Sequence, residues 1–400
     1  MSARPFDRRT LLKLVGTAAF ARVPRLGAAQ TPVTPERGAR KKIVIAGAGI
    51  MGANLAYRLA KRGADVTVVE RARPAAGATA NSFAWINSTF AKQPFAYFSL
   101  NRLGIEAWQQ LCAEIGPELP VRWGGSVEWY GDEKRAAELR ANVHHHATWG
   151  YPTHLIDEAA LRAMEPHVKP GPIAAASYSE LEGAADPVRA AELLLDRAKQ
   201  AGARITFPAE VTALDQRAGR LRAVKTTAGD IEADVLIVAC GTDTPRVAAM
   251  AGVRVPLKDS PGVLVHTPPR PRVLERVVLS PIAHMKQKPD GRIVTGSGFG
   301  GTPTTEASRD AGERFLKTAS EVLPEFRNCE VEKVTLGWRP LPQDEFPVIG
   351  FPPDRRDVYI TVMHSGVTLS PLVGHLAAME ILDGVDAEPL APYRPARFKS

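Results

Sequence analysis

Residues 42–70 carry the sequence feature that most constrains how this chain can fold. An apolar, β-branched run at 42–46 leads into the glycine-rich turn GAGIMG at 47–52. A helical pattern follows, and a second apolar run ends in an acidic residue. A buried strand, a tight turn, a helix and a second parallel strand form a βαβ unit, which is the fingerprint of a dinucleotide site. The order therefore predicts an α/β fold with a Rossmann-like domain.

The residues of this turn have distinct physical roles in holding a pyrophosphate. Gly47 permits the tight turn, Gly49 lets the backbone approach the phosphates, and Gly52 lets the helix pack closely on the strand. The helix N-terminus, at Ile50 and Met51, offers free N–H groups and a partial positive charge to the phosphates.

The acid that closes the unit is Glu70, eighteen residues after Gly52. A carboxylate at this place is expected to accept hydrogen bonds from the ribose hydroxyls. It also disfavours a 2′-phosphate, so NADP is not expected. The unit alone leaves FAD and NAD as alternatives.

Charge, apolar runs and cysteine spacing exclude several classes of protein. Without residues 1–29, the net charge of +8 falls to +3, from 45 cations and 42 acids. A field this weak, without a basic stripe interleaved with aromatic residues, does not predict nucleic-acid binding. No apolar run approaches the roughly 18 residues of a transmembrane segment. The three cysteines are far apart and form no CxxC motif, so neither a zinc site nor a disulfide framework is expected.

The first 29 residues resemble a twin-arginine export signal. Arg8 and Arg9 precede a modestly apolar stretch at 14–21, and small residues at 27–29 fit a cleavage site. This route carries folded proteins, often with their cofactor already bound. The prediction is export to the periplasm, with a linker at 30–41. The alternative is a basic tail on a cytoplasmic enzyme.

The segment at 70–87 resembles the stretch after the ribose acid in the D-amino-acid oxidase superfamily, which includes glycine oxidase, sarcosine oxidase and the D-amino-acid dehydrogenases. Four further blocks resemble the same family in the same order. They are GAADP at 183–187, the buried run at 234–241, GWRPLPQD with PVIG at 337–350, and HSGVTLSPLVG at 364–374. An NAD dehydrogenase does not need the last two blocks, so the resemblance implies FAD.

The resemblance also implies a set of FAD contacts. Small and hydroxyl residues after Glu70 wrap the pyrophosphate, and a glycine loop begins a helix whose N-terminus faces the flavin pyrimidine. Besides the first turn and Glu70, the implied FAD-binding residues are Arg71, Thr79, Ser82, Val211, Ala239, Gly241, Arg339, Ser365, Gly366, Val367 and Thr368. Non-covalent FAD is expected, because no cysteine follows Cys329 and no histidine lies in 77–87, where covalent relatives have theirs.

Family members enter and leave the nucleotide domain several times along the chain. The implied FAD domain comprises residues 42–95, 180–255 and 335–385. The implied substrate domain is a discontinuous α+β unit of residues 96–179 and 256–334, with an antiparallel sheet and helices on one side. Helical patterns are found at 101–115 and 133–149, and strand patterns at 273–279 and 292–296. Residues 386–400 remain as a C-terminal tail.

An amino-acid or amine substrate follows from the same resemblance, which implies hydride transfer from the carbon bearing the amine to flavin N5. Arg339 is the predicted clamp for the substrate carboxylate, because its rigid guanidinium fork suits a bidentate pair. The alternative for Arg339 is a structural ion pair with Asp344 or Glu345. His284 is a second candidate catalytic residue, at a place where relatives have a pocket tyrosine; its alternative is an ordinary core or surface histidine.

Two other features were weighed as possible sites. Successive helix residues point about 100° apart, so the three histidines at 144–146 cannot share a tetrahedral site, and no metal is predicted. Tyr130, Tyr178 and Trp338 are interpreted as core residues rather than pocket aromatics.

Three functional alternatives therefore follow from the sequence. The first is an FAD-dependent amino-acid or amine oxidoreductase that passes electrons to oxygen or to a respiratory carrier. The second is an enzyme of the same fold that oxidises a 2-hydroxy acid. The third is a flavin-binding accessory or electron-transfer protein without turnover of its own. The sequence indicates neither the substrate nor the oligomeric state.

Overall fold

The structure is a computed structural model that describes residues 40–90, 92–298 and 301–398. The predicted export signal and nearly all of the linker after it lie outside the described residues, so both stay predictions. Within the described ranges, no helix is long and apolar enough to cross a membrane.

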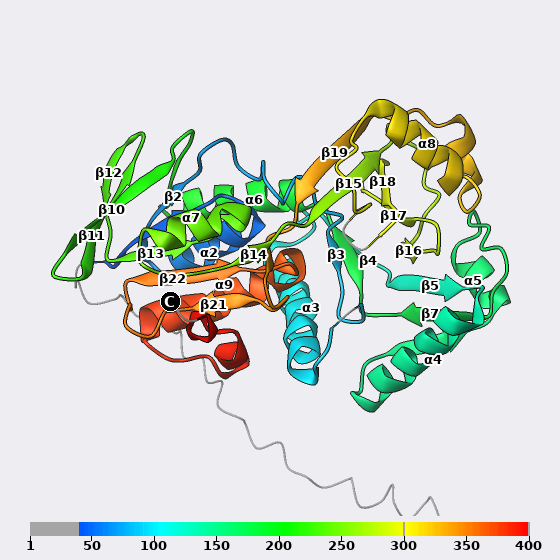
Figure 1. Ribbon diagram of the computed structural model, residues 1–400, viewed down its shortest axis with the longest axis horizontal. Helices are drawn as coiled ribbons and strands as arrows, with labels where there is room; N and C mark the ends of the chain where they lie inside the picture. The colour runs from blue at the N-terminus through cyan, green and yellow to red at the C-terminus, as the bar shows by residue number, and fades with distance from the viewer. Residues whose placement is uncertain (1–39, 91, 299–300, 399–400) are drawn as a thin grey trace, which may run out of the picture. The chain divides into compact units, whose positions relative to one another are not determined.

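Six strands form the sheet that carries the glycine-rich turn (Figure 1). Every neighbouring pair is parallel except the last pair at one edge, β21 with β22. The order is β21 (Val348–Gly350), β22 (Val358–Val362), β13 (Val235–Val238), β1 (Lys42–Ala46), β2 (Asp65–Val69) and β9 (Arg204–Thr206). The central strand β1 is buried on both faces, which explains its uninterrupted apolar run.

The two faces of this sheet are covered differently. Ile43 and Ile45 pack in one apolar cluster with three helices, α2 (Ile50–Lys61), α6 (Pro187–Gln200) and α9 (Gly366–Asp383). Val44 and Ala46 face the other way and pack with a second set of elements. That set comprises β10 (Val211–Arg217), β11 (Arg220–Thr226), β12 (Gly229–Glu232) and α7 (Thr244–Ala249).

The start of α6 lies within the GAADP block and is set by local signals. The Asp186 side chain accepts a hydrogen bond from the Arg189 N–H, and Pro187 occupies the first helical position. These are local signals, since a capping acid and a proline stabilise the first turn wherever the helix packs.

An eight-stranded sheet forms the other large layer (Figure 1). All pairs are antiparallel except β16 with β5, which are parallel. The order is β19 (Lys333–Trp338), β15 (Pro261–His266), β18 (Ile293–Gly296), β17 (His284–Gln287), β16 (Val277–Leu279), β5 (Ser126–Tyr130), β7 (Ala175–Ser179) and β6 (Thr153–Ile156).

Helices lie on both faces of this sheet, which corrects the expectation of helices on one side. Val127 and Trp129 pack with α5 (Glu158–Met164), α8 (Arg309–Ala319) and η2 (Pro324–Asn328). Tyr130 and Ala175 point the other way and pack with α4 (Glu133–Thr148). The side chains of a strand alternate between faces, so neighbouring residues reach different helices.

Short elements connect the two large sheets. They are a three-stranded sheet of β3 (Trp85–Ile86), β8 (Gly183–Ala185) and β4 (Val121–Trp123), and the pair β14 (Leu257–Lys258) with β20 (Leu341–Pro342). Helix α3 (Phe95–Ile115) packs on α9 and begins six residues before the predicted start at residue 101. Tyr97 and Phe98 extend its buried stripe towards the N-terminus. The strand predicted at 273–279 is shorter than expected, because β16 begins only at Val277.

The C-terminal residues pack against the body of the protein. They form two short helices, η3 (Glu388–Tyr393) and η4 (Pro395–Arg397). Leu390 and Tyr393 are buried in the same cluster as α9, and Arg394 forms an ion pair of 2.5 Å with the buried Glu380. What the sequence suggests as a tail is therefore an ordered part of the core.

Candidate cofactor and substrate site

A cavity of about 350 Å³ lies at the glycine-rich turn. Its lining includes the last residues of β1 and β2 and those just after β13, so it opens at the carboxyl ends of parallel strands, where α/β folds bind ligands. The predicted FAD-binding residues that line it are Gly47, Gly49, Ile50, Met51, Glu70, Arg71, Thr79, Ser82, Val211, Ala239, Gly241, Arg339, Gly366 and Val367.

The remaining three predicted FAD-binding residues lie just behind this lining. A Cβ on Gly52 would come within 1.9 Å of the Gly47 carbonyl oxygen, so Gly52 allows the helix to approach the turn. Ser365 precedes α9 and is buried, and Thr368 donates a hydrogen bond to the Trp85 carbonyl at 3.3 Å. All three residues lie behind the residues that line the cavity and help to hold them in place.

The turn is shaped for close approach of a phosphate. Gly47 has a φ of +106°, and a Cβ there would come within 2.4 Å of the Ala239 carbonyl oxygen. The Ile50 N–H donates to Thr79 Oγ1 at 3.0 Å, which ties the segment after Glu70 to the start of α2. A backbone cradle at a helix N-terminus is the arrangement that binds a pyrophosphate, so the residues present fit FAD.

Glu70 is held rigidly at the end of β2. One carboxylate oxygen accepts from the Ala48 N–H and the other from the Ala72 N–H, both at 3.0 Å. Each carboxylate oxygen has a second lone pair, so both can still accept from a ribose hydroxyl. The predicted role of Glu70 therefore has a geometric basis, because the turn and the acid are joined by a hydrogen bond.

The N-terminus of α9 also reaches this cavity. Gly366 and Val367 line it, and the first N–H groups of a helix have no partners within that helix. Ser365 Oγ lies 2.6 Å from Lys92 Nζ and 2.8 Å from the Tyr97 hydroxyl. Burial lowers the pKa of the Lys92 ammonium to about 7.

His364 completes this part of the lining. Burial, with the charges of Lys92 and Arg339, lowers the pKa of His364 to about 3, so its ring is neutral at physiological pH. Neutral His364 and the N–H groups at the start of α9 therefore present dipoles to the cavity, and Lys92, which is protonated in part near pH 7, lies behind them.

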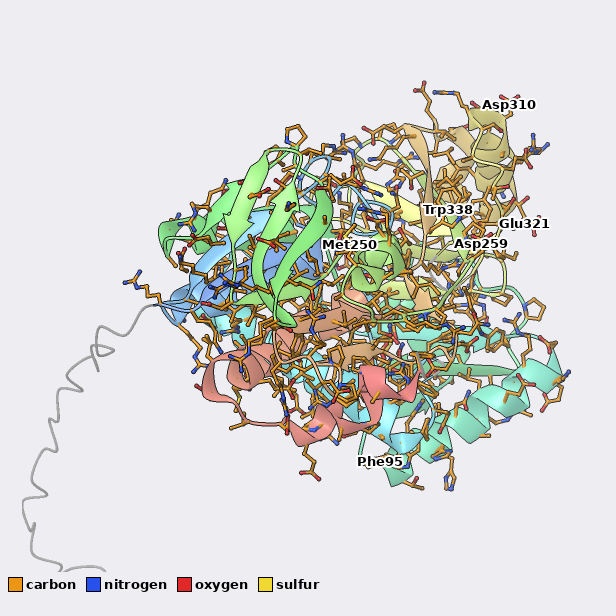
Figure 2. All side chains as sticks on the ribbon, turned by 60° about the vertical axis from the view of Figure 1, so that its left-hand side comes forward. Phe95, Met250, Asp259, Asp310, Glu321 and Trp338 are labelled. Carbon is orange, nitrogen blue, oxygen red and sulfur yellow. The ribbon has the colours of Figure 1, made fainter. Side chains whose placement is uncertain are left out.

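Lys92 and Tyr97 were not predicted from the sequence as site residues. One signal was available, since Lys92 is a lone cation among the aromatic residues of the segment at 90–98. Trp338 was interpreted as a core residue, and this was wrong: the side chain, labelled in Figure 2, is 44% exposed and lines the cavity.

Arg339 lines the cavity without forming the predicted alternative ion pair. Its guanidinium donates to Ser260 Oγ at 3.0 Å and to the carbonyl oxygens of Pro261 and Gly301 at 2.8 and 3.0 Å. Desolvation by burial lowers its pKa. Among the described residues, Nε has no hydrogen-bond partner.

The acids considered for that ion pair have other partners. Asp344 pairs with Arg397 at 2.6 Å, and Glu345 pairs with Lys258 at 2.7 Å. The Arg339 guanidinium is therefore hydrogen-bonded to neutral oxygens, and it has no carboxylate partner in the described part of the chain.

His284 does not line this cavity, although a short path leads from it to Arg339. His284 is paired with Gly296 across β17 and β18. A Cβ on Gly296 would lie 2.9 Å from the Gly301 Cα, and the Gly301 carbonyl accepts from Arg339. The ring of His284 is buried, its Nδ1 has no hydrogen-bond partner among the described residues, and burial lowers its pKa to about 4.

The three consecutive histidines have separate surroundings. The buried His146 stacks on Phe98 with ring centroids 5.5 Å apart, and burial lowers its pKa to about 4, whereas His144 and His145 are exposed. No group of three or more metal-ligating side chains is found within the described ranges.

Comparisons with known proteins agree with this geometry. Residues 42–379 match the model of the DAO family, described as FAD dependent oxidoreductase. Hydrogen cyanide synthase subunit HcnC of Pseudomonas aeruginosa is 27% identical, with 89% of this chain and 96% of that protein covered. Glycine oxidase of Geobacillus kaustophilus is 26% identical, with 90% and 97% covered.

Solved structures share the fold. The crystal structure of L-proline dehydrogenase from P. horikoshii superposes with a TM-score of 0.80 at 26% identity, covering 90% of this chain and 98% of that one. That of glycine oxidase from Geobacillus kaustophilus gives a TM-score of 0.81 at 22% identity, covering 90% and 100%. The predicted α/β fold, with a Rossmann-like domain and a second domain built on a mainly antiparallel sheet, is thereby confirmed, and both large sheets contain parallel and antiparallel pairs.

Proposed function

We propose a reaction for this chain that starts from its family, because the chain belongs to the DAO family of FAD-dependent oxidoreductases. The proposed reaction is oxidation of a C–N bond in an amino acid or in a primary or secondary amine. FAD, when bound, supplies the redox chemistry by accepting a hydride. Glycine oxidase and L-proline dehydrogenase, whose names specify amino-acid substrates, support this choice.

The observation that carries the proposal is the state of Arg339. Its guanidinium lines the cofactor cavity and is partly desolvated, and among the described residues it donates only to carbonyl and hydroxyl oxygens. A substrate carboxylate would provide the negative charge that this cation lacks, and a guanidinium fork binds a carboxylate in a defined orientation. Arg339 would therefore orient the carbon that is oxidised.

Other groups of the chain would assist a substrate held in this way. The N–H groups at the start of α9, at Gly366 and Val367, can stabilise negative charge that develops beside them. Lys92, hydrogen-bonded to Ser365, adds a positive charge near the same helix terminus when it is protonated, below a pKa of about 7. The low pKa values of His284 and His364 keep both rings neutral, so neither repels an amine.

An anaerobic screen tests the proposal. Bound FAD loses its absorbance near 450 nm when a substrate reduces it, so amino acids, amines and 2-hydroxy acids are added to the oxygen-free holoenzyme. Bleaching by an amino acid or amine, and not by its hydroxy-acid counterpart, is the expected result. Bleaching by hydroxy acids alone would reassign the reaction, and no bleaching by any donor would favour an accessory protein.

We further propose that electrons pass to oxygen or to a respiratory carrier, and that the twin-arginine-like leader directs the protein to the periplasm. Reoxidation of the reduced enzyme by oxygen in stopped flow separates the two acceptors. Cell fractionation of the protein with Arg8 and Arg9 replaced by lysine tests export, and unchanged localisation would contradict it. The FAD is proposed to be non-covalent, so acid precipitation should release it into the supernatant.

A further inference from the structure

The serine that precedes helix α9 does not cap it, unlike the capping residues of four other helices. Before α4, α5, α6 and α8 stands an aspartate or a serine whose side chain accepts a hydrogen bond from the N–H three residues later. Ser308 does so for α8, with the Ala311 N–H as the donor at 3.1 Å. Ser365 occupies the same place before α9, yet its side chain forms no capping hydrogen bond within the described residues.

Both the backbone and the side chain of Ser365 explain this difference. Ser308 has the extended backbone that is usual for a capping residue, with a ψ of 160°, whereas Ser365 has a ψ of 30°. The Ser365 hydroxyl accepts a hydrogen bond from Lys92 Nζ at 2.6 Å, and its oxygen lies 2.8 Å from the Tyr97 hydroxyl. Lys92 and Tyr97 therefore engage the oxygen that a capping serine offers to its own helix.

Packing fixes the two residues that bind Ser365. The buried ring of Tyr97 is edge-on to Phe346, with centroids 5.5 Å apart, and lies 6.2 Å from the ring of Tyr393. Lys92 is also buried, and its Nζ lies 5.1 Å from the centroid of the Tyr97 ring. The contacts with Ser365 therefore belong to the core, where neither partner can turn away into solvent.

The rest of the first turn of α9 is anchored by other contacts. The Val367 carbonyl accepts a hydrogen bond from Trp108 Nε1 at 2.8 Å. The Thr368 hydroxyl donates to the Trp85 carbonyl at 3.3 Å. Loss of the contacts with Ser365 would therefore release this one residue while the helix stays in place.

The first turn of α9 lies along the same sheet edge as the other parts of the cofactor cavity. In the sheet order, β22, which precedes α9, is two strands from β1 with its glycine-rich turn and three strands from β2, which Glu70 follows. An FAD with its ribose at Glu70 and its pyrophosphate at the turn has its isoalloxazine ring beyond the pyrophosphate, and Gly366 and Val367 line the same cavity. Free N–H groups there would stabilise the negative charge that reduction adds to the ring.

We propose that Lys92 and Tyr97 are positioning residues for the start of α9. By binding the Ser365 hydroxyl, they prevent this serine from capping its own helix, so the first N–H groups of α9 stay open to the cofactor. The consequence is a higher reduction potential of the bound FAD, because free donors favour its more negative, reduced form. The inference rests on the FAD binding of the family and is independent of the proposed C–N oxidation.

The test measures the reduction potential of the bound FAD against a reference dye, which requires no substrate. Lys92→Met frees Ser365 to cap the helix, so the potential should fall. Adding Ser365→Ala should reverse part of this fall, because alanine has no oxygen with which to cap. We expect the double variant to lie at least about 30 mV above Lys92→Met, which corresponds to a tenfold change in the affinity for reduced relative to oxidised FAD.

The double variant separates positioning from charge. Both variants lack the Lys92 ammonium, so a direct effect of its charge on the cofactor is the same in each. Equal potentials in the single and the double variant would assign the fall to charge alone and overturn the proposal.

Tyr97→Phe gives a second comparison, in which no charge changes and the ring that packs on Phe346 remains. Its potential should also fall, and Ser365→Ala should again raise it. If Lys92→Met does not retain FAD, this pair of variants decides the question. A potential that Tyr97→Phe leaves unchanged would overturn the role of the tyrosine.

Two controls remove comparable groups elsewhere. Ser308→Ala removes a cap that is present, so it should lower the Tm and leave the potential unchanged. Tyr57→Phe removes a hydroxyl that bonds to Glu114 outside the cofactor cavity, and it should also leave the potential unchanged. A merely structural role of Lys92 and Tyr97 would change the Tm and the FAD content of their variants without shifting the potential, and that result would likewise overturn the proposal.

Discussion

Arg339 donates a hydrogen bond from Nη2 to the carbonyl oxygen of Gly301 at 3.0 Å. This contact fixes one side of the guanidinium fork to the loop after β18, and the bonds to Ser260 and Pro261 fix the other. The cation is therefore oriented by neutral acceptors while its charge is not neutralised by them. A guanidinium arranged in this way is ready to bind an anion.

Replacing Arg339 with alanine should weaken binding of a carboxylate substrate and leave FAD in place. We expect KM to rise at least tenfold, because a desolvated charge pair contributes roughly 2–5 kcal/mol and a tenfold change needs only about 1.4 kcal/mol. Steady-state kinetics measure the effect, and the ratio of FAD to protein absorbance checks the cofactor. The same assay with an amine lacking a carboxylate is the control, since its KM should be unaffected. An unchanged KM for the carboxylate substrate would show that Arg339 does not bind the substrate carboxylate.

Replacing Glu70 with glutamine should weaken the binding of FAD but not the binding of FMN. Glu70 is held by the N–H groups of Ala48 and Ala72 and faces the predicted ribose position, and FMN lacks the adenosine half of FAD. Hydrogen bonds to charged groups contribute about 1.5–3 kcal/mol, so the Kd for FAD should rise roughly tenfold or more. Quenching of flavin fluorescence by apoprotein measures both affinities, with the exposed Glu232→Gln as control. An equal loss for FMN would place the acid elsewhere on the cofactor.

Gly47 and Gly63 both have a positive φ, so substituting each of them distinguishes the cost of backbone strain from the cost of steric overlap. Gly47 and Gly63 have φ values of +106° and +84°, but a Cβ on Gly63 meets nothing within 4 Å, whereas one on Gly47 overlaps the Ala239 carbonyl. Gly63→Ala should cost about 1–2 kcal/mol of unfolding free energy through backbone strain. Gly47→Ala should cost more and lower the FAD content. Urea unfolding measures the difference, and equal losses would mean that the turn tolerates a side chain.

Lys92 should make stability depend on pH. Its folded-state pKa of about 7 lies below the usual 10.5, so between these values the unfolded chain binds the additional proton and stability rises with pH. Below pH 7 Lys92 is protonated in both states, and burial of its ammonium lowers the free energy of unfolding by the full amount. Lys92→Met should therefore raise the Tm of the holoenzyme most below pH 7 and least near pH 10, whereas the exposed Lys317→Met should not. A Tm gain that is independent of pH would contradict the shifted pKa.

The parts of the fold that were predictable depend on local signals. The turn at Gly47 and the capping pair Asp186 and Pro187 act on residues within one helical turn, so their structural consequences can be read along the chain. Two-residue β3 has no such signal, because it exists only through pairing with β8 about a hundred residues later. Helix α4 was predicted, but the face of the sheet that it covers was not, because amphipathicity does not specify a partner.

The same distinction applies to the site. Glu70 and the glycines were identified because their spacing reflects one βαβ unit, and their contacts lie within it. Lys92 was missed because its partner Ser365 is 273 residues away, and nothing around either residue indicates the other. A second cavity, of about 330 Å³ beside α4, was not predicted for the same reason, because Ser126, Glu128 and Ser177 each resemble ordinary strand residues.

The sequence by itself determined the dinucleotide turn, its acid and the family, because these depend on short-range geometry and on blocks in a recognisable order. Only the tertiary structure decided that Arg339 has neutral partners, that Lys92 lies at the start of α9, and that Glu128 shares a sheet face with His284. These relationships arise from burial, from strand register and from the packing of segments that are far apart in the sequence. Burial, register and packing determine the charge state and the neighbours of a side chain, and the position of a residue along the chain does not reveal either of these.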